Sequence, residues 1–443
     1  MINILFKILI IHILHFTLNA NKIYEPVFNF KLDKLLYDSG ESWNSLSLFG
    51  NKSFGSFFKK KVSFQNIPNF SFSLINNKIS FSSTIMLNYK NNFYLYKNLF
   101  LKQKSQNVSF DFYSHNIIEN NNFSEFGYEN NWANIAICYG NEGWGSGNTI
   151  NLAMNKYAKP YDYFKISSDY GNLRVKYIHG FLERTPDNIN RYITARGLEW
   201  SNKNSLILGL SETTIYSGLN RPFDISYINP ISSHLEIELN DRVNNIGASN
   251  GNAVWQFHSE LLILKKIRFS FNFLFDEFVI DKNIQKNKEH GKAYSYRISY
   301  VASNEKNRIV TIYSKHIYVG TPTFRHSNGI NNFVNNSSPL GWDKGSDAEE
   351  FLLGINYCNK SNFFLILESG LTQTGEENIL NRSYDPYKDY LKGSFPSGKY
   401  EENIFFKTRI DWWVKGKNIF SITINDETKK KREFILSLNR RIF

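Results

Sequence analysis

The sequence is short of proline and cysteine, and beyond its first twenty residues it has no long apolar run. Of its 443 residues, 10 are proline and 2 are cysteine. The cysteines, Cys138 and Cys358, have no metal-ligand spacing and no activating neighbour, so they are interpreted as small strand residues, with a disulfide between them left open. No later stretch reaches the roughly 18 apolar residues that a membrane-spanning helix needs. These absences exclude a helical membrane domain and predict neither a metal site nor a cofactor.

Acidic residues are fewer than basic ones. The chain has 40 Asp and Glu against 52 Lys and Arg, which gives a net charge of +12. A net positive charge favours binding to nucleic acid, to an anionic membrane surface or to an acidic polymer. The densest basic runs, at 59–61 and 429–432, lie between strand-like segments and are interpreted as solvated turns. No zinc-finger spacing or basic helix is present, so nucleic acid is not expected as a partner.

Aromatic residues are abundant, at 16% of the chain, with Phe 38, Tyr 26 and Trp 8. Aromatic side chains fit the pleated, half-buried surface of a sheet, and disordered chains have few of them. The composition therefore favours an ordered protein built of strands.

The N-terminus is predicted to be a secretory signal peptide over residues 1–20. Lys7 precedes the apolar stretch 8–16, and small and polar residues follow up to a cleavage site near Ala20. Residues 21–61 lack clean alternation and are predicted to form a short periplasmic extension. Residues 62–443 are predicted to form one further domain.

From about residue 62 the dominant pattern has period two. In the segment 267–275, Ile267 and the four phenylalanines at positions 269, 271, 273 and 275 share one face, while Arg268, Ser270 and Asn272 share the other. The segments 294–300, 351–357 and 404–412 repeat the pattern. A soluble sandwich looks similar locally. The signal peptide, the number of strands and the charged second face favour a transmembrane antiparallel β-barrel of about 18 strands with a polar lumen.

Four polar stretches are expected to be loops: 117–131, 281–291, 326–349 and 376–402. The longer loops of such barrels usually face outside the cell. The last residue, Phe443, is aromatic, as is common at the end of outer-membrane barrels. In a regular strand, however, Phe443 and Phe434 would lie on opposite faces. A bulge in the last strand would reconcile the two.

The segment 190–278 holds a dense series of polar motifs. It contains Asn-Arg-Tyr-Ile-Thr-Ala-Arg-Gly-Leu-Glu-Trp from Asn190, then Asn-Arg-Pro-Phe-Asp from Asn220 and Tyr-Ile-Asn-Pro from Tyr227. With Pro-Leu-Gly-Trp from Pro339 and Gly-Ser-Asp-Ala from Gly345, it resembles the capsule assembly Wzi family of outer-membrane barrels, in its Bacteroidetes-like form. The resemblance covers roughly residues 130–443.

The resemblance implies an eighteen-stranded barrel that attaches capsular or extracellular polysaccharide to the cell surface as a lectin and not as an enzyme. It also implies an N-terminal helical bundle, for which residues 21–61 are short and poorly helical. The implied partners are the polysaccharide, the lipid of the outer membrane and other components of polysaccharide export.

The candidate residues for binding polysaccharide, or for a polar network in the lumen, come mainly from the same segment. They are Arg196, Glu199, Glu212, Asn220, Arg221, Asp224, His234, Asp241, Arg242, Asp276, Glu277, Arg297, Trp144 and Trp342. Arginine can grip a carboxylate through two hydrogen bonds, and a tryptophan ring can stack on a sugar. The alternative for the tryptophans, which include Trp200 and Trp255, is an interfacial girdle or a packed wall.

Two catalytic interpretations of these residues have less support than polysaccharide binding. Paired carboxylates such as Glu199 and Glu212 suit a glycosidase. We favour the alternative that they neutralise Arg196, Arg221 and Arg297 inside the lumen. His234 lies beside Ser233, but no nucleophile motif surrounds the serine, and a strand is favoured there over a short helix. No catalytic residue is predicted. The leading prediction is a non-enzymatic polysaccharide-binding barrel, the second a solute channel and the third an outer-membrane hydrolase.

Overall fold

The computed structural model describes the barrel region and leaves the N-terminus outside. The described residues are 69–75, 78–88, 93–103, 110–111, 124–129, 133–147, 150–155, 158–202, 205–240, 251–264, 266–276, 287–305, 308–359, 363–387, 393–414, 418–428 and 430–441. Up to residue 111 only the backbone is described. The predicted signal peptide 1–20, the predicted extension 21–61 and Phe443 lie outside these ranges.

The described residues form 21 strands and two short helices. The strands are β1 (Asn69–Ile75), β2 (Lys78–Asn88), β3 (Phe93–Gln103), β4 (Phe110–Asp111), β5 (Ser124–Glu129), β6 (Ala133–Gly140), β7 (Tyr161–Asp169), β8 (Leu173–Arg184), β9 (Ile189–Ser201), β10 (Leu206–Leu219), β11 (Asn252–Ile263), β12 (Ile267–Phe275), β13 (Lys292–Asn304), β14 (Arg308–Val319), β15 (Val334–Asn335), β16 (Ser338–Pro339), β17 (Ala348–Asn359), β18 (Phe363–Thr374), β19 (Glu401–Val414), β20 (Asn418–Glu427) and β21 (Lys430–Arg441). The helices are α3 (Ile225–Ile228) and α4 (His234–Leu239).

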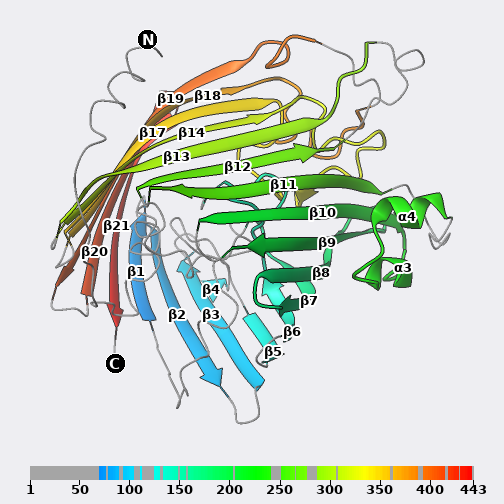
Figure 1. Cartoon of the computed structure of the whole chain (residues 1–443), viewed down its shortest axis with the longest axis horizontal. Coiled ribbons are helices and arrows are strands. Elements are labelled where there is room, and N and C mark those ends of the chain that lie inside the picture. The colour runs from blue at the N-terminus through cyan, green and yellow to red at the C-terminus, as the bar shows by residue number, and fades with distance from the viewer. Residues whose placement is uncertain are drawn as a thin grey trace.

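The strands form one large antiparallel sheet in which neighbours in sequence are neighbours in space. The sheet counts 19 strands with the two-residue β4 included, and β15 and β16 form a separate hairpin. β1 pairs with β2 on one side and with the last strand, β21, on the other. The strand pairings thus lead from β1 along the chain to β21 and back to β1. Figure 1 shows the sheet strongly curved.

The alternation predicted from sequence decides which face of each strand points outward. In β12, Arg268, Ser270 and Asn272 are buried, whereas Phe269, Phe271 and Phe273 are half-exposed. In β17, Phe351, Leu353 and Ile355 are exposed while the residues between them are buried. Polar side chains lie inside and apolar ones outside, the reverse of a soluble protein. The predicted all-β barrel with a polar interior is confirmed.

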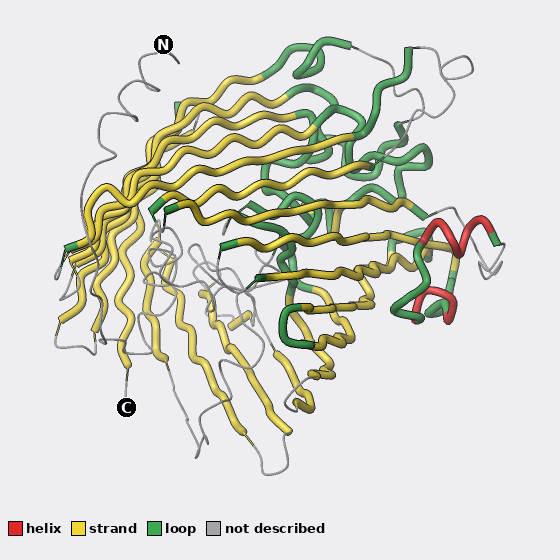
Figure 2. The backbone as a smooth tube through the Cα atoms, in the orientation of Figure 1, coloured by secondary structure: helices red, strands yellow, loops and turns green. Residues whose placement is uncertain are grey.

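The long connections between strands all lie at one end of the strands. At one end, three or four residues separate the strands of the pairs β7–β8, β9–β10, β11–β12, β13–β14, β17–β18 and β19–β20. The opposite end carries the connections 141–160, 220–251, 276–291, 320–347 and 375–400. Figure 2 shows loops along the same end of the strands as the two helices. We call this end the loop end; in outer-membrane barrels it is the side that faces outside the cell.

Two local predictions are wrong. The predicted loop 117–131 contains β5, because Phe126 and Tyr128 face outward and Glu125 inward in strand alternation. The segment after Ser233 is the helix α4 and not a strand. Ser233 caps it by accepting a hydrogen bond from the backbone N–H of Glu236.

Among the residues described, none of the helices is long and apolar enough to cross a membrane.

Candidate functional site

The connection between β6 and β7, residues 141–160, turns into the barrel and reaches strands on its far side. We call it the inner loop. The backbone N–H of Ser146 donates to Asn272 Oδ1 on β12 at 2.8 Å, and that of Gly147 donates to Glu260 Oε1 on β11 at 2.9 Å. Ser146 is fully buried. Because Asn272 and Glu260 point into the lumen, these bonds hold the inner loop across it.

The inner loop shares a hydrophobic core with two later loops. Leu152 and Met154 belong to one buried cluster with Phe333 and Leu340 from the connection 320–347 and with Ile379 from the connection 375–400. The backbone joins them as well, since the N–H of Asn155 donates to the carbonyl of Leu340 at 2.7 Å. Three loops therefore pack together at the loop end of the lumen.

Trp144 and Trp342 lie within this core. Trp144 is 1% exposed and Trp342 is 3% exposed. Between them the loops approach so closely that a Cβ atom on Gly341 would lie 1.7 Å from the carbonyl oxygen of Leu152. Neither tryptophan offers a free ring face to a sugar, so the predicted role of Trp144 and Trp342 as stacking platforms does not fit their burial.

Ion pairs line the wall beneath the loops. Lys165 Nζ lies 2.8 Å from Glu125 and Lys315 Nζ lies 2.8 Å from Glu350. Arg268 lies 3.4 Å from Glu260, the residue that also holds the inner loop. Buried charges need partners, and these pairs supply them. The interior is thus a network of cross-strand charge pairs.

Glu142 ties the start of the inner loop to this network. Its carboxylate lies 2.5 Å from Lys176 Nζ and 3.6 Å from Lys165 Nζ. Burial alone would raise the pKa of Glu142, but the two ammonium groups together lower it below its ordinary value of 4.5.

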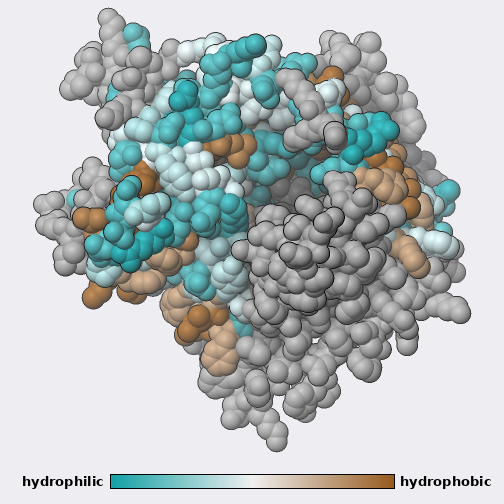
Figure 3. All heavy atoms as spheres, turned by 180° about the vertical axis from the view of Figure 1, so that it is seen from behind, coloured by the Kyte–Doolittle hydropathy of each residue, from teal (hydrophilic) through white to brown (hydrophobic). Residues whose placement is uncertain are grey.

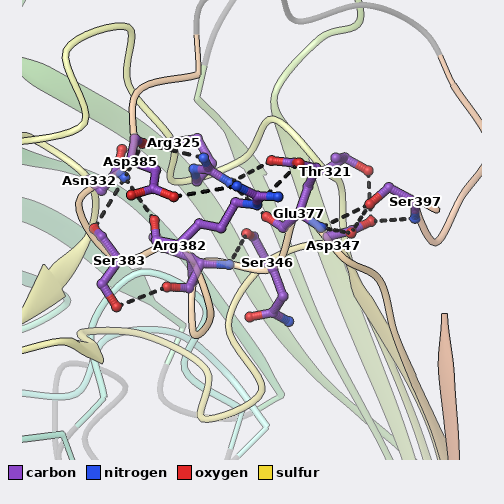
Figure 4. Close-up of polar contacts among 12 residues, drawn as sticks. Thr321, Arg325, Asn332, Ser346, Asp347, Glu377, Arg382, Ser383, Asp385 and Ser397 are labelled. Carbon is purple, nitrogen blue, oxygen red and sulfur yellow. Dashed lines mark hydrogen bonds and ion pairs between the residues drawn. The ribbon is translucent and has the colours of Figure 1, made fainter. Parts of the chain in front are cut away.

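Asp347 organises the meeting of the two later loops (Figure 4). Its carboxylate accepts hydrogen bonds from Thr321 Oγ1 at 2.8 Å, from Ser397 N at 2.9 Å and from Ser397 Oγ at 2.5 Å. It also accepts from the backbone N–H of Glu377 at 3.2 Å. Asp347 is fully buried. One side chain therefore joins both ends of the connection 320–347 to the connection 375–400.

Arg325 makes a second junction in the same view (Figure 4). Its guanidinium donates to the carbonyl of Glu377 at 2.6 Å and to that of Asp385 at 3.3 Å, and it lies 5.0 Å from the ring centre of Tyr387. Asn332 donates to the carbonyl oxygens of Ser383 and Asp385 at 3.1 Å each. The two loops are cross-linked by buried polar side chains.

The outer surface of these loops is polar. Arg382 and Asp385 form an exposed ion pair at 3.4 Å, with 44% and 56% of their side chains exposed. Exposed amide, hydroxyl and aromatic groups accompany them; these are Ser327, Asn328, Asn336, Ser337, Asn381 and Tyr400. We call this surface the loop platform and define it by these eight residues. In the opposite view of the molecule, Figure 3 shows extensive hydrophilic surface interrupted by hydrophobic patches.

Arg196 and Glu212 pair as expected, but not inside the lumen. Arg196 Nε lies 3.3 Å from Glu212 Oε2 across β9 and β10. Side chains alternate along a strand, so Arg196 lies on the same face of β9 as Leu198 and Trp200, and Glu212 lies on the same face of β10 as Leu210. Leu198, Trp200 and Leu210 are exposed, so this face is the outer one. The pair therefore lies on the outer wall. The expectation of a lumen pair is wrong because residues 220–240 fold back and cover this part of the wall.

The covering segment, residues 220–240, contains four further predicted residues. Arg221 lies 2.7 Å from Asp224, and both are almost fully buried. The backbone N–H of His234 donates to both oxygens of Glu212 at 3.1 Å, and Trp255 Nε1 donates to Glu212 at 3.1 Å. These residues converge, but they do so to fix the segment to the outer wall. Asn220, at its start, accepts from Arg184 at 2.8 Å and is exposed.

The remaining predicted residues are scattered. Glu199 faces the lumen 3.5 Å from Arg174, and Arg297 packs over the ring of Tyr313 at 4.3 Å. Asp276 accepts a hydrogen bond from the backbone N–H of Phe324. Three other predicted residues, Asp241, Arg242 and Glu277, lie outside the described residues.

Cys138 and Cys358 are both buried free thiols, so the disulfide left open by the sequence is not formed. Within the part of the chain that the structure describes, no group of three or more His, Cys, Asp or Glu side chains has a geometry that could hold a metal ion.

Sequence reasoning missed the residues that build the loop platform and its support. Arg325, Arg382 and Asp385 were not singled out, and Asp347 appeared only within a motif. A signal was available for Asp347, since it follows Gly345 and Ser346 directly before a strand, where a short polar side chain commonly bonds to loop backbone.

These features define a class: an outer-membrane β-barrel whose lumen is occupied by its own loops. No known protein family matches the sequence, and no curated protein matches it. A solved structure with this fold is Wzi, described as an outer-membrane protein involved in group 1 capsule assembly in Escherichia coli and as a carbohydrate-binding β-barrel. The two chains are 11% identical, with a TM-score of 0.64, over 96% of this chain and 100% of that one. The resemblance to Wzi is confirmed at the level of the fold.

Porins are also similar, at lower scores. Pseudomonas aeruginosa OccK10 matches with a TM-score of 0.46 at 7% identity, over 86% of this chain and 99% of that one. A BenF-like porin from Pseudomonas fluorescens matches with a TM-score of 0.45 at 7% identity, over 85% and 97%.

Proposed function

We propose that this protein binds surface polysaccharide at the loop platform, without catalysing a reaction, and so assembles or retains that polysaccharide at the outer membrane. The observation that carries the proposal is the joint packing of three loops, which turns the loop end of the barrel into a cross-linked polar surface. The fold shared with a carbohydrate-binding barrel supports it.

The chemistry of the loop platform suits a glycan. Amide and hydroxyl groups exchange hydrogen bonds with sugar hydroxyls, and the half-exposed ring of Tyr400 offers an apolar face. Arg382 can hold a carboxylate of an acidic polymer, and the net charge of +12 favours the approach of such a polymer. Asp347 and Arg325 keep the loops fixed, which lowers the entropy lost on binding.

A wide solute channel fits this arrangement less well. The inner loop crosses the lumen and is bonded to the far wall through Ser146 and Gly147. Solutes would have to pass a hydrophobic core built around Trp144 and Leu152.

A hydrolase also fits less well. A glycosidase needs two carboxylates free to face a substrate. Glu212 is engaged by Trp255 and by the backbone of His234, and Asp276 by the backbone of Phe324. Glu199 lies on the lumen side beside Arg174. We therefore assign these carboxylates to structure.

The test compares two exposed ion pairs at opposite ends of the barrel. Arg382→Ala with Asp385→Ala removes a charged part of the loop platform. The matched control is Arg308→Ala with Glu305→Ala, an exposed pair of the same spacing at the turn end. Cells expressing each variant are stained for cell-bound polysaccharide, and each purified protein is titrated with that polysaccharide. We expect the first variant to lose affinity about tenfold, corresponding to about 1.4 kcal/mol, and the control to match the wild type.

Equal binding by both variants, together with unchanged cell-bound polysaccharide after deletion of the gene, would overturn the proposal. Conductance of the wild-type protein in planar bilayers at neutral pH would instead favour the channel.

A further inference from the structure

The segment 220–240, which carries α3 and α4, is a small flap on the outside of the barrel. Figure 1 shows both helices together beside the ends of β8 to β11. We propose that this outer flap lies in the membrane interface, with its apolar face against the lipid of the outer leaflet, and that it shields a polar patch of the barrel wall from that lipid. The inference does not depend on polysaccharide binding.

The wall beneath the outer flap carries charged side chains on its outward face. Tyr177, Arg196, Glu212 and Trp255 are cross-strand neighbours on β8 to β11, and they share the outward face. An arginine and a glutamate on the lipid face of a barrel are costly unless something covers them. On β10, the outward apolar residues before Glu212 are Leu206, Leu208 and Leu210. They span about 14 Å along the strand, whereas an apolar band is about 25 Å tall.

The outer flap seals this patch with a core of its own. The rings of Tyr216 and Tyr227 stack at 4.3 Å, and Tyr192, Tyr216, Tyr227 and Ile237 form a buried cluster. Tyr177 Oη donates to the carbonyl of Tyr227 at 2.7 Å. With the contacts of Glu212 to His234, these bonds attach the flap along its length.

The large exposed side chains of the outer flap are mostly apolar. Ile225 is 80% exposed, Ile231 is 87% exposed, and Phe223, Ile228 and Leu235 are 42% to 50% exposed. Arg221, Asp224, Tyr227 and His234 are turned inward and buried, whereas Glu236 is exposed and Glu238 is half-buried. Polar-in and apolar-out is the pattern of the barrel wall and the opposite of a loop that faces water. A patch of this kind marks a membrane or protein contact.

Continuity with the wall identifies lipid as the occupant. Directly below the outer flap along the strands lie Leu210, 60% exposed, and Leu198, 42% exposed. Glu212 is in register with Trp255 and, one strand further, with Phe275, the last outward aromatic residue of β12. The outer flap thus begins where the apolar faces of its neighbours end, at the edge of the band that meets lipid.

The test places a fluorescent label on the outer flap and on the loop platform of the full chain in lipid vesicles. Ile231→Cys labels the flap, and Ser327→Cys, exposed on the loop 320–347, is the matched control. Both native cysteines are buried and are left in place. Quenching by nitroxide-labelled lipid is compared with quenching by iodide in water. We expect the label at 231 to be quenched severalfold more by the lipid probe than the label at 327, and less by iodide.

Equal quenching by iodide at both positions would overturn the proposal. So would a label at 231 that is open to iodide in pure lipid vesicles and shielded only in native outer membranes, because that result assigns the surface to a protein partner. A second measurement uses Ile231→Asp in a protein that carries the label at Ile225→Cys. The added charge should increase quenching of this label by iodide. The variant should still migrate as a folded barrel on gels run without heating.

Discussion

Glu212 shows how one side chain can fix a whole segment. Its carboxylate accepts from Trp255 on the neighbouring strand and from the backbone of His234 at the start of α4, and it faces Arg196. Both charged side chains are nearly buried. Removing either side chain leaves the other as a buried charge without its ion-pair partner. Substitution here should therefore lower the stability of the fold more than substitution in an exposed ion pair.

We expect Glu212→Ala to lower the free energy of unfolding by about 3–5 kcal/mol, the usual effect of breaking a buried pair. Glu212→Gln should cost less, because its amide oxygen can still accept from Trp255. Urea unfolding in lipid vesicles, followed by tryptophan fluorescence, measures both. Glu305→Ala removes an exposed carboxylate at the turn end and should leave unfolding unchanged. Equal midpoints for Glu212→Ala and Glu305→Ala would contradict the role given to Glu212.

The location of Arg196 and Glu212 could not be predicted from the sequence. β9 carries polar residues on both faces, with Arg191 inward and Arg196 outward, so its alternation does not say which arginine meets the lumen. The answer depends on where residues 220–240 fold, which is a tertiary property. Arg191 is bound inside by the carbonyls of Asn332 and Val334.

Among the elements, strands with one uniform face were predictable and short helices were not. The phenylalanines of β12 place its face without ambiguity. α4 has only six residues, too few for a helical period to show, although Ser233 with Glu236 three positions later is a capping signal that would have favoured a helix. The three-loop core was unpredictable because Leu152, Leu340 and Ile379 are isolated apolar residues far apart in the sequence.

Close approach of two loops makes Gly341 a critical position. We expect Gly341→Ala to push the connection 320–347 away from the inner loop, since the new methyl group would overlap the carbonyl of Leu152. Limited proteolysis of the folded protein should then cut the loops severalfold faster. The matched control is Gly393→Ala, in the connection 375–400, where no atom lies within 4 Å of the added carbon. Similar cleavage of both variants would show that the loops do not depend on this contact.

At the scale of the whole molecule, the lumen is closed by charge pairs as well as by packing. The pKa of Glu142 is below its ordinary value of 4.5 because Lys176 and Lys165 outweigh the effect of burial. A carboxylate with a lowered pKa stabilises the bound loop fully above pH 4.5, and that stabilisation is lost as the pH falls through the lowered value.

The conductance of the protein in planar bilayers should therefore increase at acidic pH. We expect the wild-type protein to be nearly silent at pH 7 and to gain conducting events as the pH falls below 4.5. Glu142→Gln, which has no charge at this position at any pH, should conduct to some extent already at pH 7. A wild-type protein that stays silent under acid, with a Glu142→Gln variant that behaves identically, would show that this ion pair does not hold the loop.

The attachment of the inner loop to distant strands also orders the assembly of the barrel. Ser146 and Asn272 are 126 residues apart in sequence, and Gly147 and Glu260 are 113 apart. The loop emerges early during synthesis and insertion, but its binding partners arrive only with β11 and β12. Contacts of such long sequence separation form late. A barrel halted before β11 would keep an open lumen and expose Trp144 and its apolar neighbours, so closure of the lumen itself reports that the later strands are in place.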